Sequence, residues 1–162
     1  METNKEESRQ KILNTTRELL IGSGYDSFNI RSVASACNMS VGTLYHYFPG
    51  KDYLVRDAML RDWKNEMSLL REQIEQKRCA IGKARLVYNC IIAYEARYMK
   101  VWCDCSAKRV YRPYENRLHL YVINDLREVS GFDRFTLEIL LRYAELPDQS
   151  FDDIEAKLKI LL

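Results

Sequence analysis

The stretch from residue 40 to residue 51 concentrates hydroxyl, phenol, imidazole and ammonium groups within a few helical turns. Its polar members of these types are Ser40, Thr43, Tyr45, His46, Tyr47 and Lys51. Such groups donate hydrogen bonds to phosphate oxygens and to the acceptor atoms that base pairs expose in the major groove. The stretch therefore predicts non-covalent recognition of double-stranded DNA.

Catalytic chemistry has no comparable support. We see no acid/base carboxylate pair, phosphate-cradling glycine loop or Ser-His-Asp arrangement, and we predict neither an enzyme nor a cofactor. Cys103 and Cys105 could share a metal in a loop, but on a helix thiolates at this spacing point apart. The only histidines are His46 and His119. We predict no metal site, and a cysteine-based redox- or metal-responsive regulator remains an alternative.

Two short helices, 30–37 and 41–48, are expected to position the polar groups. Asn29 and Ser40 are good N-caps for them, and Asn38 in the intervening turn tolerates the left-handed conformation. The small and apolar residues that hold the second helix against the first are Val33, Ala34, Met39 and Leu44. This arrangement is a helix-turn-helix.

The rest of the chain also has helical periodicity, and no segment alternates convincingly at period two, so the fold class is predicted to be all-α. A first helix is expected from about Glu6 to Ser23, ended by Gly22 and Gly24. A long connecting helix follows over 51–78. The further helices are expected from Ile81 to near Cys105, from close to Pro113 to about Val129, over 135–146 with Asp133 as a cap, and over 151–162.

Composition limits the remaining choices. The 162 residues carry a net charge of +2, so any DNA contact depends on local placement of charge. The polar N-terminus has no signal-peptide core and no apolar run approaches a membrane span, which predicts a cytoplasmic protein without membrane association. Five cysteines, an odd number, make structural disulfides unexpected in that reducing compartment.

Residues 29–54 closely resemble the DNA-binding head of the TetR family of transcriptional regulators. The residues in register with the family pattern are Ile30, Arg31, Val33, Ala34, Ser40, Gly42, Thr43, Leu44, Tyr45, Tyr47, Phe48, Lys51 and Leu54. Asn38 and Met39 stand where the family usually has glycine and valine. The resemblance implies a helix-turn-helix domain over residues 1–52 and a helical effector-binding and dimerisation domain over residues 53–162.

The resemblance also implies individual roles. Val41 and Thr43 would contact base edges, Thr43 through its hydroxyl or its methyl group, and Gly42 would allow close approach to the duplex. Arg31 would contact a phosphate or a base. The expected phosphate contacts come from Ser40, Tyr45, His46 or Tyr47, and Lys51, the last acting together with a helix N-terminus.

An effector site is predicted from aromatic residues. Tyr94, Tyr98 and Trp102 form one stripe at helical spacing that could line a cavity, although ordinary helix packing is the simpler explanation of the stripe. Tyr111, Tyr114 and His119 could complete such a cavity.

The resulting hypothesis is a transcriptional regulator, a repressor by the family's commoner mode. It would bind a palindromic operator as a homodimer and respond to a small-molecule effector. In the family, dimers commonly form through the last two helices, and the helix ending near Val129 is a second candidate here. The alternative from another class is a helical protein-interaction module whose head does not bind DNA.

Overall fold

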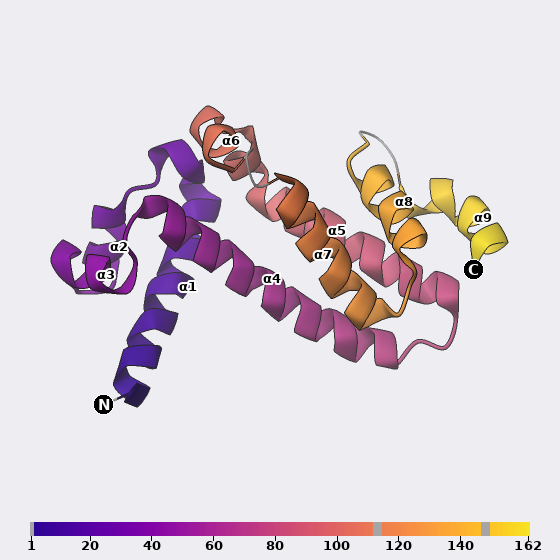
Figure 1. Ribbon diagram of the computed structural model, residues 1–162, viewed down its shortest axis with the longest axis horizontal. Coiled ribbons are helices and arrows are strands. Elements are labelled where there is room, and N and C mark those ends of the chain that lie inside the picture. Colours follow the sequence, from indigo (N-terminus) through magenta and orange to yellow (C-terminus); the bar gives the residue numbers. More distant parts are fainter. Residues whose placement is uncertain (1, 112–114, 147–149) are drawn as a thin grey trace. The chain divides into compact units, whose positions relative to one another are not determined.

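The computed structural model describes residues 2–111, 115–146 and 150–162, and this part of the chain contains helices and no strand. The all-α prediction is therefore confirmed. The helices are α1 (Glu2–Ser27), α2 (Ile30–Ala36), α3 (Val41–Tyr47), α4 (Lys51–Glu75), α5 (Ala80–Cys103), α6 (Cys105–Tyr111), α7 (Glu115–Ser130), α8 (Arg134–Ala144) and α9 (Phe151–Leu161) (Figure 1).

The described residues pack as two compact units. The head unit contains residues 2–64 and 97–111, and the body unit contains residues 65–96, 115–146 and 150–162. Helices α4 and α5 contribute to both, so neither unit is one continuous piece of sequence. The expected domain boundary after residue 52 stays a prediction.

Apolar faces of both long and short helices form the core of the head unit. Figure 1 shows α2 and α3 beside α1 and the first turns of α4. The side chains buried there include Ile12, Leu13, Leu20, Val33, Leu44, Phe48, Leu54, Tyr98 and Val101. Because the last two come from α5, residues far along the chain complete the core of the head unit.

Several helix boundaries differ from the sequence-based expectation, among them the end of α1, at Ser27 rather than Ser23, and the end of α4, at Glu75 rather than residue 78. Gly22 lies inside α1, and only Gly24 leaves the helical conformation, with φ 76° and ψ −179°. The short helix α6 was not predicted as a separate element. A single non-helical residue, Asp104, separates it from α5, and so brief an interruption leaves no glycine or proline to mark it. Pro113, expected to interrupt the pattern, lies outside the described residues.

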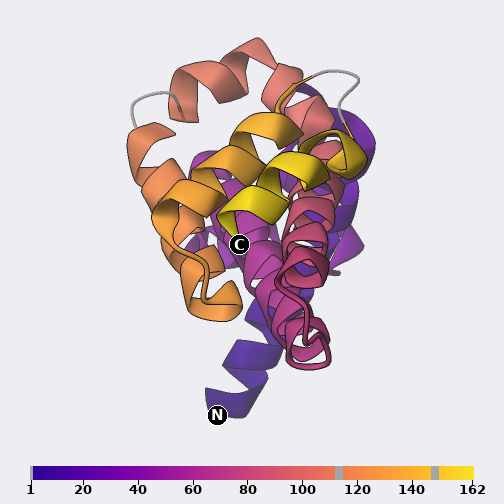
Figure 2. The ribbon, with the colours of Figure 1, turned by 90° about the vertical axis from the view of Figure 1, so that its right-hand side faces the viewer.

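The body unit packs α7 against α8 and α8 against α9 (Figure 2). Asp133 caps α8 as predicted, because its Oδ1 accepts a hydrogen bond of 3.0 Å from the Thr136 amide. Ser150 and Asp153 form a reciprocal capping box at the start of α9. Among the described helices, none combines the length and apolar character that crossing a membrane requires.

Thr16 offers a test of the core of the head unit. Its side chain is fully buried in α1, and its Oγ1 has no hydrogen-bond partner among the described residues. We expect Thr16→Val to raise the free energy of unfolding by about 1 kcal/mol, because burying an unsatisfied hydroxyl is costly. Urea denaturation measures the change. Thr15→Val is the control, since the Thr15 hydroxyl accepts a hydrogen bond from Cys37. A loss of stability in Thr16→Val would show that the Thr16 hydroxyl has a partner.

Candidate nucleic-acid interface

Local hydrogen bonds fix the turn between α2 and α3. Asn29 Oδ1 accepts the Ser32 amide at 2.9 Å, which starts α2 as predicted. Asn38 adopts φ 57°, and the Met39 amide donates back to the Ala34 carbonyl at 2.9 Å. The left-handed residue therefore reverses the chain directly after α2, as its type predicted.

Ser40 caps α3 and also holds a neighbouring hydroxyl. Its Oγ accepts the Thr43 amide at 2.9 Å and lies 2.8 Å from Thr43 Oγ1. On the opposite face of α3, Leu44 and Phe48 are buried, with exposed fractions of 0% and 1%. The helix is thus held at its first turn by hydrogen bonds and along its inner face by apolar packing.

The outer face of this helix-turn-helix carries the residues predicted to contact DNA. Those exposed to solvent are Arg31, Ser40, Gly42, Thr43, Tyr45 and His46, whereas Val41 and Tyr47 are half-buried. The His46 and Tyr47 rings meet edge to face with centroids 6.0 Å apart. Seven of the nine predicted DNA-contacting residues lie on α3 or its cap, so the structure gathers them on one short element.

Lys51, at the start of α4, makes contacts that its sequence position did not predict. Its Nζ lies 4.3 Å from the centroid of the Tyr25 ring and 5.9 Å from that of Phe28. Burial lowers the pKa of Lys51, and nearby carboxylates, Asp26 first among them, partly oppose that shift. The side chain is therefore positioned by aromatic rings rather than extended freely into solvent.

Tyr25 connects Lys51 to the end of α6. Its hydroxyl donates to the Asp52 carboxylate, and burial, aided by that carboxylate, raises the pKa of Tyr25. The Tyr111 ring meets Tyr25 edge to face at 6.2 Å, and its hydroxyl donates to the Asp52 carbonyl at 3.3 Å. Tyr111, predicted to line an effector cavity, here contacts the first turn of α4.

Arg9 supports the end of α3 and was not identified from the sequence. Its guanidinium lies 5.2 Å from the centroid of the Phe48 ring and donates to Asp57 at 2.9 Å. Arg56 donates to the other oxygen of Asp57 at 2.9 Å. Phe48 and Asp57 lie 39 and 48 positions after Arg9 in the sequence. A local sequence pattern cannot reveal contacts over such separations.

Asp62 is a buried carboxylate that joins three helices of the head unit. It accepts hydrogen bonds from Arg17 on α1 at 2.5 Å, and from Arg97 and Tyr98 on α5 at 2.7 and 3.1 Å. Asp62 belongs to α4, and its side chain is 6% exposed. One sequence signal was available, since Asp62 interrupts the apolar stripe of α4 at helical spacing from Ala58.

The predicted effector residues do not gather in one place within either unit. In the head unit, Tyr98 is fully buried against Asp62, while Trp102 is 37% exposed. In the body unit, Tyr94 is half-buried and His119 Nε2 lies 2.9 Å from Glu138. Tyr114 lies outside the described residues. Their role in binding an effector stays a prediction.

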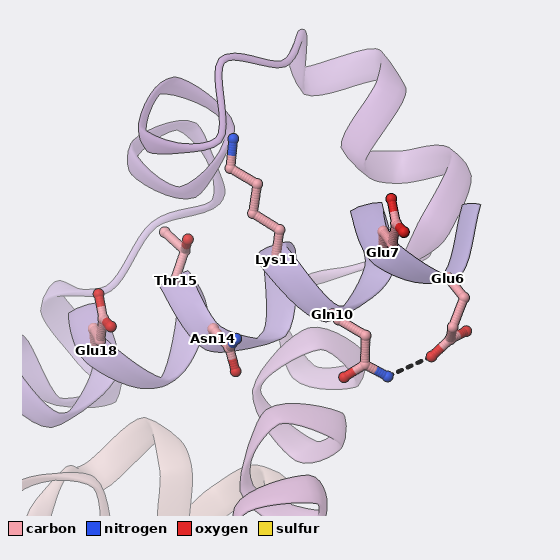
Figure 3. Close-up of a pocket in the computed structure, with 7 residues that line it drawn as sticks. All are labelled: Glu6, Glu7, Gln10, Lys11, Asn14, Thr15 and Glu18. Carbon is pink, nitrogen blue, oxygen red and sulfur yellow. Dashed lines mark hydrogen bonds between the residues drawn. The ribbon is translucent and has the colours of Figure 1, made fainter. Parts of the chain in front are cut away.

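A shallow depression on α1 contains none of those residues. It is lined by Glu6, Glu7, Gln10, Lys11, Asn14, Thr15 and Glu18 (Figure 3). All seven side chains come from one helix, and the Lys11 ammonium leaves this face to donate to the Cys37 carbonyl at the end of α2, at 3.2 Å. The depression is therefore an open helix face rather than an enclosed cavity for an apolar effector.

A metal-responsive regulator, the alternative function, would need several ligand side chains close together. Within residues 2–111, 115–146 and 150–162, no three histidine, cysteine or acidic side chains gather to hold a metal ion. Cys103 is exposed, and the side chain of Cys105 lies outside the described residues.

The two short helices, the turn between them and the capped, exposed second helix place this protein in the class of helix-turn-helix proteins. Residues 12–58 match the model of the family of bacterial regulatory proteins of the tetR family. Residues 12–58 therefore form a DNA-binding domain of the TetR family type. The family predicted from residues 29–54 is confirmed for this domain.

Curated relatives and a solved structure show the same likeness. The regulator UidR of Escherichia coli K12 is 35% identical over 75 residues, which cover 46% of this chain and 38% of UidR. The repressor KstR of Rhodococcus jostii is 38% identical over 60 residues, 37% of this chain and 28% of KstR. This chain thus spans well under half the length of these relatives. A Saccharomonospora viridis protein in complex with choline has the same fold, with a TM-score of 0.59 and 18% identity over 96% of this chain and 95% of that one.

Proposed function

We propose that the chain is a sequence-specific DNA-binding transcriptional regulator that represses by occupying a palindromic operator as a homodimer in the cytoplasm. The observation that carries this proposal is the outer face of α3. Its polar side chains are exposed while Leu44 and Phe48 anchor the helix from behind. A rigid helix with an exposed polar face is what insertion into a major groove requires.

Dimerisation follows from the geometry of DNA. Two recognition helices must reach major grooves about 34–36 Å apart, which a single head cannot do. We propose α8 and α9 as the interface, because Phe135 is 64% exposed and Ile160 is 87% exposed there. Helix α7, with Leu120 at 45% exposed, is the second candidate. A monomer at micromolar concentration by light scattering would contradict the proposal.

We also propose a small-molecule effector that binds the helical part of the chain and releases the operator. The support is the fold, which this chain shares with the Saccharomonospora viridis protein solved with choline. At 18% identity the likeness concerns the fold alone, and the chemistry of the effector is not carried over.

Selection of bound fragments from sheared genomic DNA of the host, followed by sequencing, tests the proposal. We expect an imperfect palindrome to be enriched, with affinity that falls steeply as salt rises. Recovery of no enriched sequence at low salt and without effector would instead favour the interaction module.

Lys51 provides a test at single-residue level. Lys51→Met keeps the aliphatic stem against Tyr25 and removes the charge, so we expect weaker binding to all sequences alike. The slope of log affinity against log salt should become shallower by about 1 if Lys51 neutralises one phosphate. Lys64→Met is the control, because Lys64 is 13 residues further along α4, about 20 Å away. An unchanged slope in Lys51→Met would show that Lys51 has only a packing role.

A further inference from the structure

The two hydroxyls at the start of α3 form a closed pair. Ser40 Oγ and Thr43 Oγ1 lie 2.8 Å apart, and Ser40 Oγ also accepts the Thr43 amide at 2.9 Å. A hydroxyl has one proton to donate, so one proton of the pair is used in the bond between them. Whichever residue donates, Thr43 Oγ1 is directed at Ser40.

This bond determines what Thr43 presents outward. A threonine side chain ends in two γ atoms, Oγ1 and the Cγ2 methyl, and Thr43 is exposed to solvent. Because Oγ1 is hydrogen-bonded to Ser40, the Cγ2 methyl group is the γ atom that remains available to contact a base. Turning the hydroxyl outward would break the bond to Ser40.

The same pair restricts hydrogen bonding to bases. When Ser40 donates its proton to a phosphate, the proton of Thr43 lies in the bond between the two residues. Thr43 then has no proton for the major-groove acceptors of guanine, N7 and O6. Its methyl group can still pack against the C5-methyl of thymine, an apolar contact that distinguishes thymine from the other bases.

We propose that Thr43 is a specificity-determining residue that recognises a thymine of the operator through methyl–methyl contact, with Ser40 holding its hydroxyl away from the base. This inference rests on the proposed function, because it concerns the operator that α3 would bind. The sequence alone allows Thr43 to contact a base through its hydroxyl or through its methyl group. The 2.8 Å bond between Ser40 Oγ and Thr43 Oγ1 favours the methyl group.

The experiment uses the full chain and the operator recovered by fragment selection. Each thymine of one half-site is replaced in turn by uracil, which lacks only the methyl group, and affinity is measured for three proteins. The wild type should lose about fourfold at one position, the effect of one buried methyl group. Thr43→Val keeps both the γ methyl and the β-branch and should show the same loss. Thr43→Ser keeps the hydroxyl and should bind the thymine and uracil operators equally.

Three outcomes separate the inference from the proposed function. If the wild type binds its operator but tolerates uracil at every position, the role of the Thr43 methyl group is overturned and the proposed function stands. The same holds if Thr43→Ser retains the full uracil effect, since a side chain other than Thr43 would then contact the thymine methyl group. Failure of the wild type to enrich any sequence overturns the proposed function, and the inference with it.

Discussion

Asp62→Ala is expected to lower the free energy of unfolding by about 3 kcal/mol, because removing one member of a buried ionic cluster leaves the others uncompensated. Arg17 and Arg97 would then face each other across the space left by the carboxylate, and the buried Tyr98 hydroxyl would lose its acceptor. The arginine side chains are 36% and 22% exposed, so water relieves part of the cost and places the estimate at the low end for such clusters. Urea denaturation followed by circular dichroism measures the loss.

A surface pair supplies the matched control for Asp62. Glu128 forms an ion pair of 2.9 Å with Arg71, but its side chain is 73% exposed. Glu128→Ala should change stability by less than about 0.5 kcal/mol, the usual range for solvated ion pairs. Equal effects of the two substitutions would show that the carboxylate of Asp62 is not the organising contact of the head unit.

The second large effect is expected at Gly24 of α1, and a neighbouring glycine of the same helix, Gly22, should change the free energy of unfolding in the opposite direction. Gly24→Ala should destabilise the protein by about 2–4 kcal/mol, because φ 76° with ψ −179° is a conformation that almost only glycine adopts. An added Cβ would also lie 2.7 Å from an Asp104 carboxylate oxygen. That oxygen accepts the Asp26 amide at 2.9 Å, so the substitution disturbs the contact between the end of α1 and the start of α6.

Gly22→Ala is the internal comparison. Gly22 lies inside the helix with no heavy atom within 4 Å of an added Cβ. Alanine should therefore stabilise the protein by about 0.5–1 kcal/mol through its higher helix propensity. Thermal and urea unfolding of both variants measure the two changes, and effects of the same sign would contradict the backbone conformation at Gly24.

Features governed by neighbours in sequence could be predicted. The caps Asn29, Ser40 and Asp133 and the left-handed Asn38 each follow from the chemistry of one residue and the three or four beside it. The family pattern over residues 29–54 then gave the helix-turn-helix as a whole. All of these were predicted and confirmed because the interactions that decide them are local.

Features governed by contacts across the chain could not be predicted. Asp62 reaches Arg17 and Arg97, 45 and 35 positions away, and Asp104 accepts an amide 78 positions away. Helical periodicity places a residue on a face of its own helix but does not say which helix lies opposite. The aromatic stripe of α5 shows the same limit, since Tyr98 is buried against a carboxylate while Trp102, four residues on, is exposed.

The discontinuous make-up of the head unit has a consequence for biosynthesis. Residues 2–64 are translated before residues 97–111, but the core of the head unit also contains Tyr98 and Val101. The hydrogen bond from Arg97 to Asp62 likewise requires the later segment. Contacts of long sequence separation form late, because a long loop must close before they contribute. The core of the head unit is therefore complete only after residues 97–111 have been translated, and a nascent chain that stops at residue 64 lacks part of that core.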